Sequence, residues 1–155
     1  MLLFRYMTIS RKKLGEIGEK IAEDFLKRKG YKILDRNFSI RSAFGPKIGE
    51  IDIVAEPRRN PFGVLWGKKD KIISFVEVKT LAAAPPAFER RDSSISPEQK
   101  VNFQKQRKLI KTAQSWLMKN KIPLNKKWQI DVIAIKIDLD SKKAKLHHFK
   151  NAVSV

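Results

Sequence analysis

The sequence predicts a single α/β domain, with a restriction-endonuclease-like mixed β-sheet flanked by helices. Three observations favour this fold class. The chain has 155 residues, enough for one domain with a sizeable core and too few for two ordinary domains. Hydrophobic residues make up 42% of it, as expected for a globular protein. Helical spacings and short β-branched runs alternate in the order α-β-β-β-α-β-β, which is typical of one sheet covered by helices.

The first helix is predicted over residues 14–29. Apolar residues recur there at helical spacing, and Gly30 ends the run after three basic residues. Residues 1–13 are interpreted as a basic N-terminal extension, and residues 14–152 as the single domain.

Three acids of this helix differ in the direction that they face. On a helical wheel, Glu19 projects at the margin of the apolar face, whereas Glu16 and Glu23 lie farther round toward water. Glu19 is therefore the acid expected to look inward.

Three strands are predicted next, over residues 31–38, 50–56 and 71–80, because these runs are short and rich in β-branched and aromatic residues. Residues 38–48 are interpreted as a basic loop that contains Gly-Pro. Residues 57–70 are interpreted as a long hairpin loop with basic and aromatic side chains.

A second helix is predicted to begin at Ser96, which would be its N-cap, with Pro97 at the first helical position and Gln99 closing a capping box. Lys105 is expected at the edge of its apolar face. That face is predicted to comprise Phe103, Leu109, Ile110, Ala113, Trp116 and Leu117.

Two final strands are predicted over residues 128–137 and 143–149, joined as a hairpin across Asp140 and Ser141. His147 and His148 are adjacent in the second of them and so face opposite ways, which argues against a metal site made from both.

Charged side chains on the apolar strands are the strongest indication of function. Glu50 and Asp52 lie on the second predicted strand, Glu77 and Lys79 on the third, and Lys71 at its start. A buried carboxylate with no partner costs several kcal/mol, roughly, so these charges need a reason. Side chains alternate along a strand, so each pair shares one face, and strand pairing would bring the acids together.

Such acids suit a Mg²⁺ site, because carboxylate oxygens, a carbonyl such as that of Val78 and water are the ligands that Mg²⁺ prefers. A metal there could polarise a phosphodiester and activate a water molecule. Lys79 could orient that water or stabilise developing charge, and Glu19 could complete the site. The alternative is a structural ion-pair network of Asp52, Glu77 and Lys79, and the residues alone leave both open.

The overall charge indicates a polyanionic partner. Thirty-four Lys and Arg residues outnumber 16 Asp and Glu, which gives a formal net charge of +18. Nucleic acid is the commonest large polyanion, although lysine-rich faces can also be merely solvated. The absence of cysteine suits a cytoplasmic setting, and no apolar stretch approaches the ~18 residues that a membrane span needs.

The sequence resembles the YraN-like family of uncharacterised bacterial proteins. The resemblance runs from about Leu14 to Ala152, and the Gly-Glu-Ile-Asp and Val-Glu-Val-Lys-Thr blocks are specific when they occur together. The blocks that carry it are Gly15 to Glu19, Gly30-Tyr31, Arg36-Asn37, Gly49 to Asp52, Phe75 to Thr80, the Lys105 helix, Asp131 to Ile133 and Asn151-Ala152.

That family is similar to the PD-(D/E)xK nuclease superfamily, especially archaeal Holliday-junction resolvases and restriction endonucleases. The resemblance implies that Asp52 is the motif aspartate, that Glu77 and Lys79 form the (D/E)xK pair, and that Glu19 is the helix-one acid. Metal ligation is then expected from Asp52, Glu77 and Glu19, with Mg²⁺ as the ion and Mn²⁺ as a substitute. Glu50 becomes a neighbour of the site.

Nucleic-acid contacts are expected from Lys105, Arg58, Arg59 and Trp66. The loops at 38–48 and 57–70 are longer than the family pattern, and an arginine expected near Leu81 is missing. Aromatic residues in the second loop could stack on bases or cover the edge of the sheet.

The expected function is a Mg²⁺-dependent endonuclease that acts on DNA, branched or nicked DNA included, by direct hydrolysis. The alternative is a non-catalytic nucleic-acid-binding protein that keeps the nuclease fold, and a third candidate is an assembly protein with an acidic partner. A homodimer is an open expectation, because cutting two strands takes two sites. No membrane partner is expected.

Overall fold

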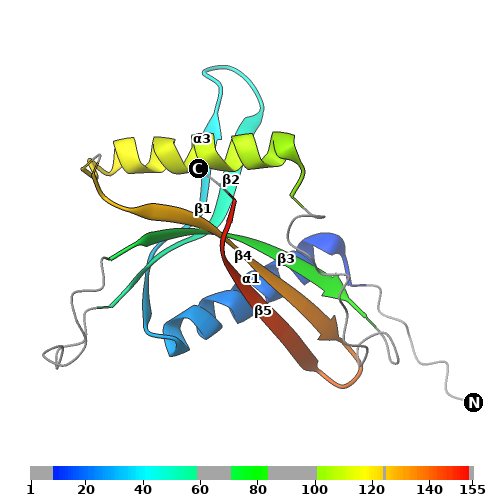
Figure 1. Cartoon of the computed structure of the whole chain (residues 1–155). Coiled ribbons are helices and arrows are strands. Elements are labelled where there is room, and N and C mark those ends of the chain that lie inside the picture. The colour runs from blue at the N-terminus through cyan, green and yellow to red at the C-terminus, as the bar shows by residue number, and fades with distance from the viewer. Residues whose placement is uncertain (1–8, 59–70, 84–100, 124, 154–155) are drawn as a thin grey trace, which may run out of the picture.

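The structure, a computed structural model, describes residues 9–58, 71–83, 101–123 and 125–153. Its elements, in chain order, are α1 (Arg11–Arg28), β1 (Tyr31–Arg41), β2 (Lys47–Pro57), β3 (Ile73–Ala82), α3 (Phe103–Lys119), β4 (Trp128–Asp138) and β5 (Lys143–Val153). The strands form one mixed sheet, with α1 on one face and α3 on the other (Figure 1). The predicted fold class and element order are confirmed.

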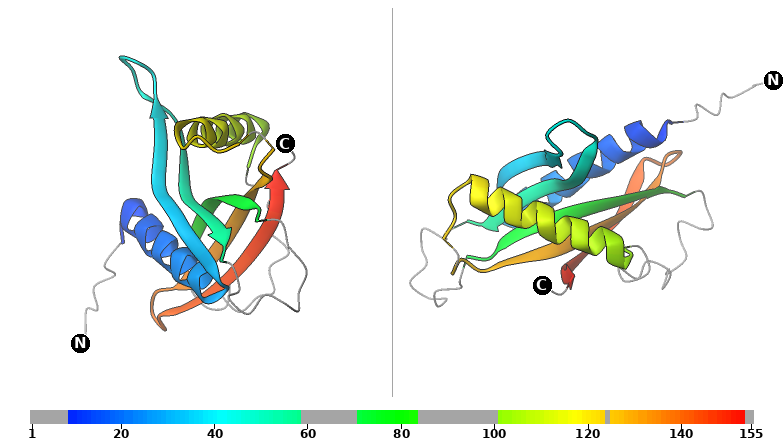
Figure 2. Two further views of the ribbon diagram at one scale, coloured as in Figure 1. Left: turned by 90° about the vertical axis from the view of Figure 1, so that its left-hand side faces the viewer. Right: turned by 90° about the horizontal axis from the view of Figure 1, so that it is seen from above.

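The spatial order of the strands in the sheet follows their order along the chain, from β1 to β5. All neighbours are antiparallel except β3 and β4, which run parallel. A parallel pair needs a crossover connection, and the segment that contains α3 provides it. The crossover carries α3 over one face of the sheet (Figure 2).

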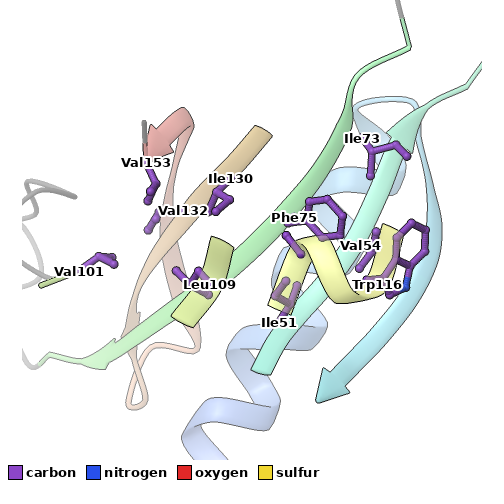
Figure 3. Packing of buried hydrophobic residues seen from close by; sticks show 11 residues of the cluster. Ile51, Val54, Ile73, Phe75, Val101, Leu109, Trp116, Ile130, Val132 and Val153 are labelled. Carbon is purple, nitrogen blue, oxygen red and sulfur yellow. The ribbon is translucent and has the colours of Figure 1, made fainter. Parts of the chain in front are cut away.

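Each helix seals a separate hydrophobic core. On the α3 face, Phe75 packs edge-on against Trp116 (Figure 3). The Trp116 indole donates to Asp35 Oδ2 at 2.8 Å. On the α1 face, Ala22 and Leu26 are fully buried against strand residues such as Val76. Neither helix of the described chain is long and apolar enough to cross a membrane.

The helix α1 ends as predicted, with Gly30 at φ +84°. The expectation that Glu23 faces water is wrong, because its side chain is only 11% exposed. Arg36 of β1 donates to it from Nε at 2.7 Å, and Lys27 pairs with it as well. The hydrogen bonds to Arg36 and Lys27 lower the pKa of Glu23 to about 2. Two cations therefore compensate a carboxylate that the helix packs against the sheet.

The second helix does not run continuously from Ser96. Residues 96–100 lie outside the described part of the chain, Val101 and Asn102 are not helical, and Asn102 caps the helix by accepting from the Lys105 N–H. Phe103 was predicted on the apolar face but is 70% exposed. It lies in the first turn, where the Arg107 guanidinium covers its ring at 5.6 Å.

The predicted loop over 38–48 is mostly strand. The first two strands extend into a long hairpin, so that only residues 42–46 form its turn. Backbone pairing continues as far as Arg41 with Lys47.

The terminal hairpin of β4 and β5 is anchored by a buried carboxylate. Asp131 is fully buried, and its two oxygens contact His148 Nε2 and the Asn151 N–H, each at 2.9 Å. The β4–β5 register shifts at this point, and the Asn151 backbone adopts a left-handed φ of 51°. Asp131 of β4 thus accepts a backbone N–H of β5 at an irregular stretch, where a strand carbonyl would otherwise accept it. The contact between His148 and Asp131 also links the terminal strand β5 to β4.

Gly18 allows α1 to approach β3. A Cβ at this position would lie 1.8 Å from Thr80 Oγ1 and 2.8 Å from Thr80 Cβ, whereas a Cβ at Gly15, one turn earlier, would meet nothing within 4 Å. Gly18→Ala should therefore lower the free energy of unfolding by about 1–3 kcal/mol through overpacking. Gly15→Ala should raise it by about 0.5–1 kcal/mol through helix propensity.

Urea unfolding followed by circular dichroism measures both changes. Gly15→Ala is the matched control, because it adds the same methyl group to the same helix. Equal effects of the two substitutions would contradict a close approach at Gly18.

Candidate active site

The two central strands of the candidate site part from each other. β2 and β3 pair only from Ile53 to Ala55 against Val76 to Ser74, and the register ends there. At the next position Asp52 Oδ2 accepts the backbone N–H of Val78 at 2.7 Å. No backbone carbonyl of β2 pairs with the Val78 amide here. The Asp52 carboxylate accepts its hydrogen bond instead.

The side-chain alternation of β2 is interrupted at this point. Ile51 and Val54 both pack into the core on the α3 face, although strict alternation places residues three apart on opposite faces. Asn37 lies opposite Asp52, since its neighbours Arg36 and Phe38 pair with Ile53 and Ile51. The Asn37 backbone has a φ of 50°, in the left-handed region. Both strands are thus irregular beside Asp52.

Glu77 is the buried acid of the site, with only 6% of its side chain exposed. Lys79, two residues along the same strand, places its Nζ 2.8 Å from Glu77 Oε1. Lys105 reaches the same oxygen from α3. Burial lowers the pKa of Lys105, but the hydrogen bond to Glu77 and the charges of Glu77 and Asp52 outweigh burial, so its pKa lies above the ordinary value. Two ammonium groups therefore neutralise Glu77.

The surroundings of Asp52 disfavour the charged form of its carboxyl group. Burial raises the pKa of its carboxyl most, and the negative charge of Glu77 raises it further. The Val78 N–H lowers it, while Glu19 and Glu50 raise it, and the resulting pKa of Asp52 is about 7. A cation between these acids would relieve the repulsion.

Glu19 joins the site from α1. Burial raises its pKa first, a hydrogen bond from the Asn37 side chain lowers it, and the charges of Glu50, Glu16 and Glu77 raise it again, so that its pKa is above the ordinary value. The helix α1 packs on the opposite face of the sheet from α3. The charges of Glu50 and Glu77 nevertheless raise the pKa of Glu19. The gap between β2 and β3 explains this, because no strand backbone pairs across it there.

An open pocket of about 380 Å³ lies over Asp52 and Glu77. Its other walls come from the β1–β2 hairpin and from α3, and are formed by Lys47, Ile48, Gly49, Glu50, Asn102, Gln104, Lys105, Lys108 and Leu109. The floor is acidic and three lysines line the sides. The lysines can attract a polyanion. The acids can hold a cation, to which one group of that polyanion could bind.

Gly49 brings α3 close to the hairpin. A Cβ at Gly49 would lie 2.2 Å from Thr112 Oγ1 and 3.4 Å from the Lys108 carbonyl oxygen. The Thr112 hydroxyl itself donates to that carbonyl at 2.7 Å. The glycine of the Gly-Glu-Ile-Asp block therefore sets the position of the helix that carries Lys105 and Lys108.

The structure brings together most of the residues predicted for the site. Lys79 and Lys105 both contact Glu77 directly, whereas Asp52 and Glu19 are coupled to Glu77 by charge. Glu50 lines the pocket and pairs with Lys47.

Other predicted residues lie elsewhere. Lys71, which the sequence places at the edge of a loop and not in the site, pairs with Glu56 at 3.7 Å, away from the pocket. Arg58 follows the far end of β2, where its N–H donates to the Gly30 carbonyl. Arg59 and the aromatic residues Phe62 and Trp66 lie outside the described residues.

Three residues were not singled out for the site from the sequence. Lys47 and Lys108 line the pocket, and Asn37 binds Glu19. Asn37 belongs to the Arg-Asn block that carries part of the family resemblance, so a signal existed. The two lysines had none, because the chain contains 34 Lys and Arg residues.

The donor set fits a hard divalent cation in chemistry. Asp52 and Glu77 supply carboxylate oxygens from adjacent strands, and their negative charges repel each other. Among the described residues, the side chains as they stand form no group of three acids or histidines that would hold a metal. Glu77 is engaged by Lys79 and Lys105 instead, so a metal would have to replace at least one ammonium group.

Comparisons with known proteins agree on one family. A family model described as "Uncharacterised protein family UPF0102" matches residues 18–135. A UPF0102 protein of Alkaliphilus oremlandii is 37% identical over 91% of this chain and 97% of its own length. Another, of Clostridium tetani, is 41% identical over 75% of this chain and 74% of its own.

One solved structure also aligns with the chain. It is Pyrococcus furiosus SfsA in complex with Ca²⁺, at 14% identity and a TM-score of 0.32, over 95% of this chain and 66% of that one. This similarity is too low to indicate either fold or function.

Proposed function

The chain belongs to the uncharacterised protein family UPF0102, the YraN family, and we propose that it is a Mg²⁺-dependent endonuclease that hydrolyses phosphodiester bonds in DNA. One observation carries the proposal. Asp52 and Glu77 converge where β2 and β3 part, at the floor of a pocket lined by lysines. Their negative charges repel each other. The two floor residues are the two acids that the resemblance to the PD-(D/E)xK pattern assigns, and Lys79 contacts one of them, Glu77.

Asp52 and Glu77 would hold the metal ion, and Glu19 would contribute a third carboxylate from α1. When bound, Mg²⁺ polarises the phosphodiester and lowers the pKa of a water molecule. The hydrogen bond from the Val78 N–H fixes the orientation of Asp52 before any metal binds. Pre-organisation of this kind lowers the cost of forming the site.

Lys79 has the role closest to the chemistry in this proposal. Its ammonium group lies beside Glu77 in the absence of metal, and from the same place it can orient the attacking water or stabilise charge on the phosphate. Lys105, Lys108 and Lys47 line the walls, where they can bind phosphates on either side of the reacting one. The net charge of +18 attracts the same polyanion over a longer range.

Cleavage assays with Mg²⁺ or Mn²⁺ test the proposal on duplex, single-stranded and four-way-junction DNA. Lys79→Ala should lower the cleavage rate by about 10²-fold or more, because the variant loses charge stabilisation at the phosphate. Lys71→Ala is the matched control, since Lys71 precedes the same strand but pairs with Glu56 outside the pocket. Equal rates for wild type and Lys79→Ala would contradict this catalytic assignment.

A second candidate function has one observation in its favour. Glu77 is neutralised by two lysines, so the site is electrostatically complete around this acid without a metal. A non-catalytic nucleic-acid-binding protein would need no more than this. Metal-independent binding with a steep salt dependence, and no turnover on any of the three DNA forms, would favour it.

A further inference from the structure

The turn of the β1–β2 hairpin presents an aromatic ring to solvent. Phe44 is 105% exposed relative to a free side chain, and it is the most exposed large hydrophobic residue in the described part of the chain. The turn that carries it is closed by a hydrogen bond from the Gly45 N–H to the Ser42 carbonyl at 3.3 Å. A Cβ at Gly45 would lie 2.1 Å from Ser42 Oγ, so the turn is tight. A hydrogen-bonded turn therefore presents the ring to solvent.

The hairpin is continuous with the candidate active site. Its second strand begins at Lys47, which with Ile48 lines the pocket, and the same strand leads to Asp52. The hairpin rises past α3 (Figures 1 and 2), the helix that supplies another wall of the pocket. A long substrate that crosses the pocket beside α3 can therefore also meet the turn.

The chemistry around Phe44 favours nucleic acid over an apolar partner. Arg41 and Lys47 flank the turn, both exposed, and no acid lies between residues 41 and 47. A single aromatic ring between basic residues is the combination with which proteins bind unpaired bases, where the cations bind the backbone and the ring stacks on a base. Ile48, 40% exposed, adds a second apolar side chain at the base of the hairpin.

We propose, on the basis of the proposed function, that Phe44 stacks on an unpaired base and so directs the active site to DNA in which a base has left the duplex stack. A paired base offers no free face to the ring unless it is flipped out at an energetic cost. Branch points, flaps and bulges provide such bases at no further cost. The hairpin would thus make DNA distortion, and not sequence, the basis of recognition.

The length of the strand sets a minimum distance between the unpaired base and the bond that is cut. From Lys47 to Asp52 the strand spans about 17 Å, at ~3.4 Å per residue, and Phe44 lies beyond this span, in the turn between β1 and β2. Stacked base pairs also rise by ~3.4 Å, so this span matches about five base steps. A test substrate should therefore carry its unpaired base with at least that length of duplex on each side.

Binding without cleavage tests the proposal. An Asp52→Asn protein is titrated, without metal, into fully paired duplex and into the same duplex with one extrahelical 2-aminopurine, and anisotropy and 2-aminopurine emission are followed. We expect tighter binding of the bulged DNA, and Phe44→Ala in this background should reduce the preference by about 5- to 100-fold. Phe44→Trp should keep it. Phe103→Ala, which removes the exposed ring of α3, should leave it unchanged.

The outcomes separate this proposal from the proposed function. A preference for bulged DNA that Phe44→Ala leaves intact, or equal binding of both DNA forms, would overturn the stacking role even if the wild type cleaves DNA. Loss of the preference in Phe44→Ala would support stacking even if the wild type cleaves nothing, in which case the nuclease proposal alone fails. Absence of DNA binding would overturn both.

Discussion

Asp52→Asn should abolish Mg²⁺-dependent cleavage and at the same time make the protein more stable. The cleavage rate should fall by about 10³-fold or more, because the amide supplies no anionic oxygen to a metal. The fold should survive, since the asparagine side-chain oxygen can still accept the Val78 N–H that Asp52 accepts at 2.7 Å. A loss of activity with a gain of stability is characteristic of a functional group held under electrostatic strain.

The gain in stability should depend on pH. The pKa of Asp52 is about 7 in the folded protein, against an ordinary value of 3.8. Between these values the folded state keeps a proton that the unfolded state has released, so the stability of the wild type falls as pH rises from about 4 to 7. Asp52→Asn should therefore match the wild type near pH 4 and exceed it by on the order of 4 kcal/mol at pH 8.

Urea unfolding at several pH values, beside cleavage assays, checks both parts. Asp24→Asn is the control, because Asp24 is a carboxylate of α1 that pairs at the surface with Lys20. It should change neither activity nor the pH profile of stability. A stability difference between wild type and Asp52→Asn that is the same at every pH would contradict the raised pKa of Asp52.

Removal of both lysines from Glu77 should destabilise the protein strongly. Lys79→Met and Lys105→Met together leave a carboxylate that is 6% exposed without a cation, which should cost about 3–5 kcal/mol. Each single substitution should cost less, because the other ammonium group remains in contact with Glu77. Adding Glu77→Gln to the double variant should restore most of the loss, since the buried charge is then gone.

The double variant also provides a test of metal binding that does not depend on activity. Mn²⁺ should raise its melting temperature more than it raises that of the wild type, because the metal no longer competes with the ammonium groups of Lys79 and Lys105 for Glu77 and binds the folded state. Glu77→Gln in the double variant should abolish this shift. Lys108→Met, which removes another lysine of the same pocket, should leave the response to metal as in the wild type. A shift of the same size after Glu77→Gln has removed the carboxylate would contradict metal binding at Glu77.

Much of the architecture was accessible from the sequence because it depends on local patterns. The glycine at position 30 ends α1 as predicted, and the two strands near the C-terminus pair across Asp140 and Ser141. The boundaries that failed depended on packing over longer distances. The hairpin strands continue to Arg41 and from Lys47 because they pair with each other, although their composition is that of a basic loop.

The helix-one acids show the same division. Glu19 was expected at the margin of the apolar face, and its pKa shift reflects that position. Glu23 was expected in water, but Arg36 from β1 covers it at 2.7 Å. A helical wheel describes one helix in isolation, so it carries no information on which strand will pack beside it or which cation that strand will bring.

The sequence by itself determined the order of the elements, the family, and the acids and lysine on the two central strands, because periodicity and short motifs are local properties of the chain. Only the tertiary structure decided how these charges are used. It separated β2 from β3 beside Asp52, turned the Asp52 carboxylate to the Val78 amide, and brought Lys105 from α3 to Glu77. These features arise from contacts between residues far apart in sequence, and burial together with the charge of Glu77 raises the pKa of Asp52.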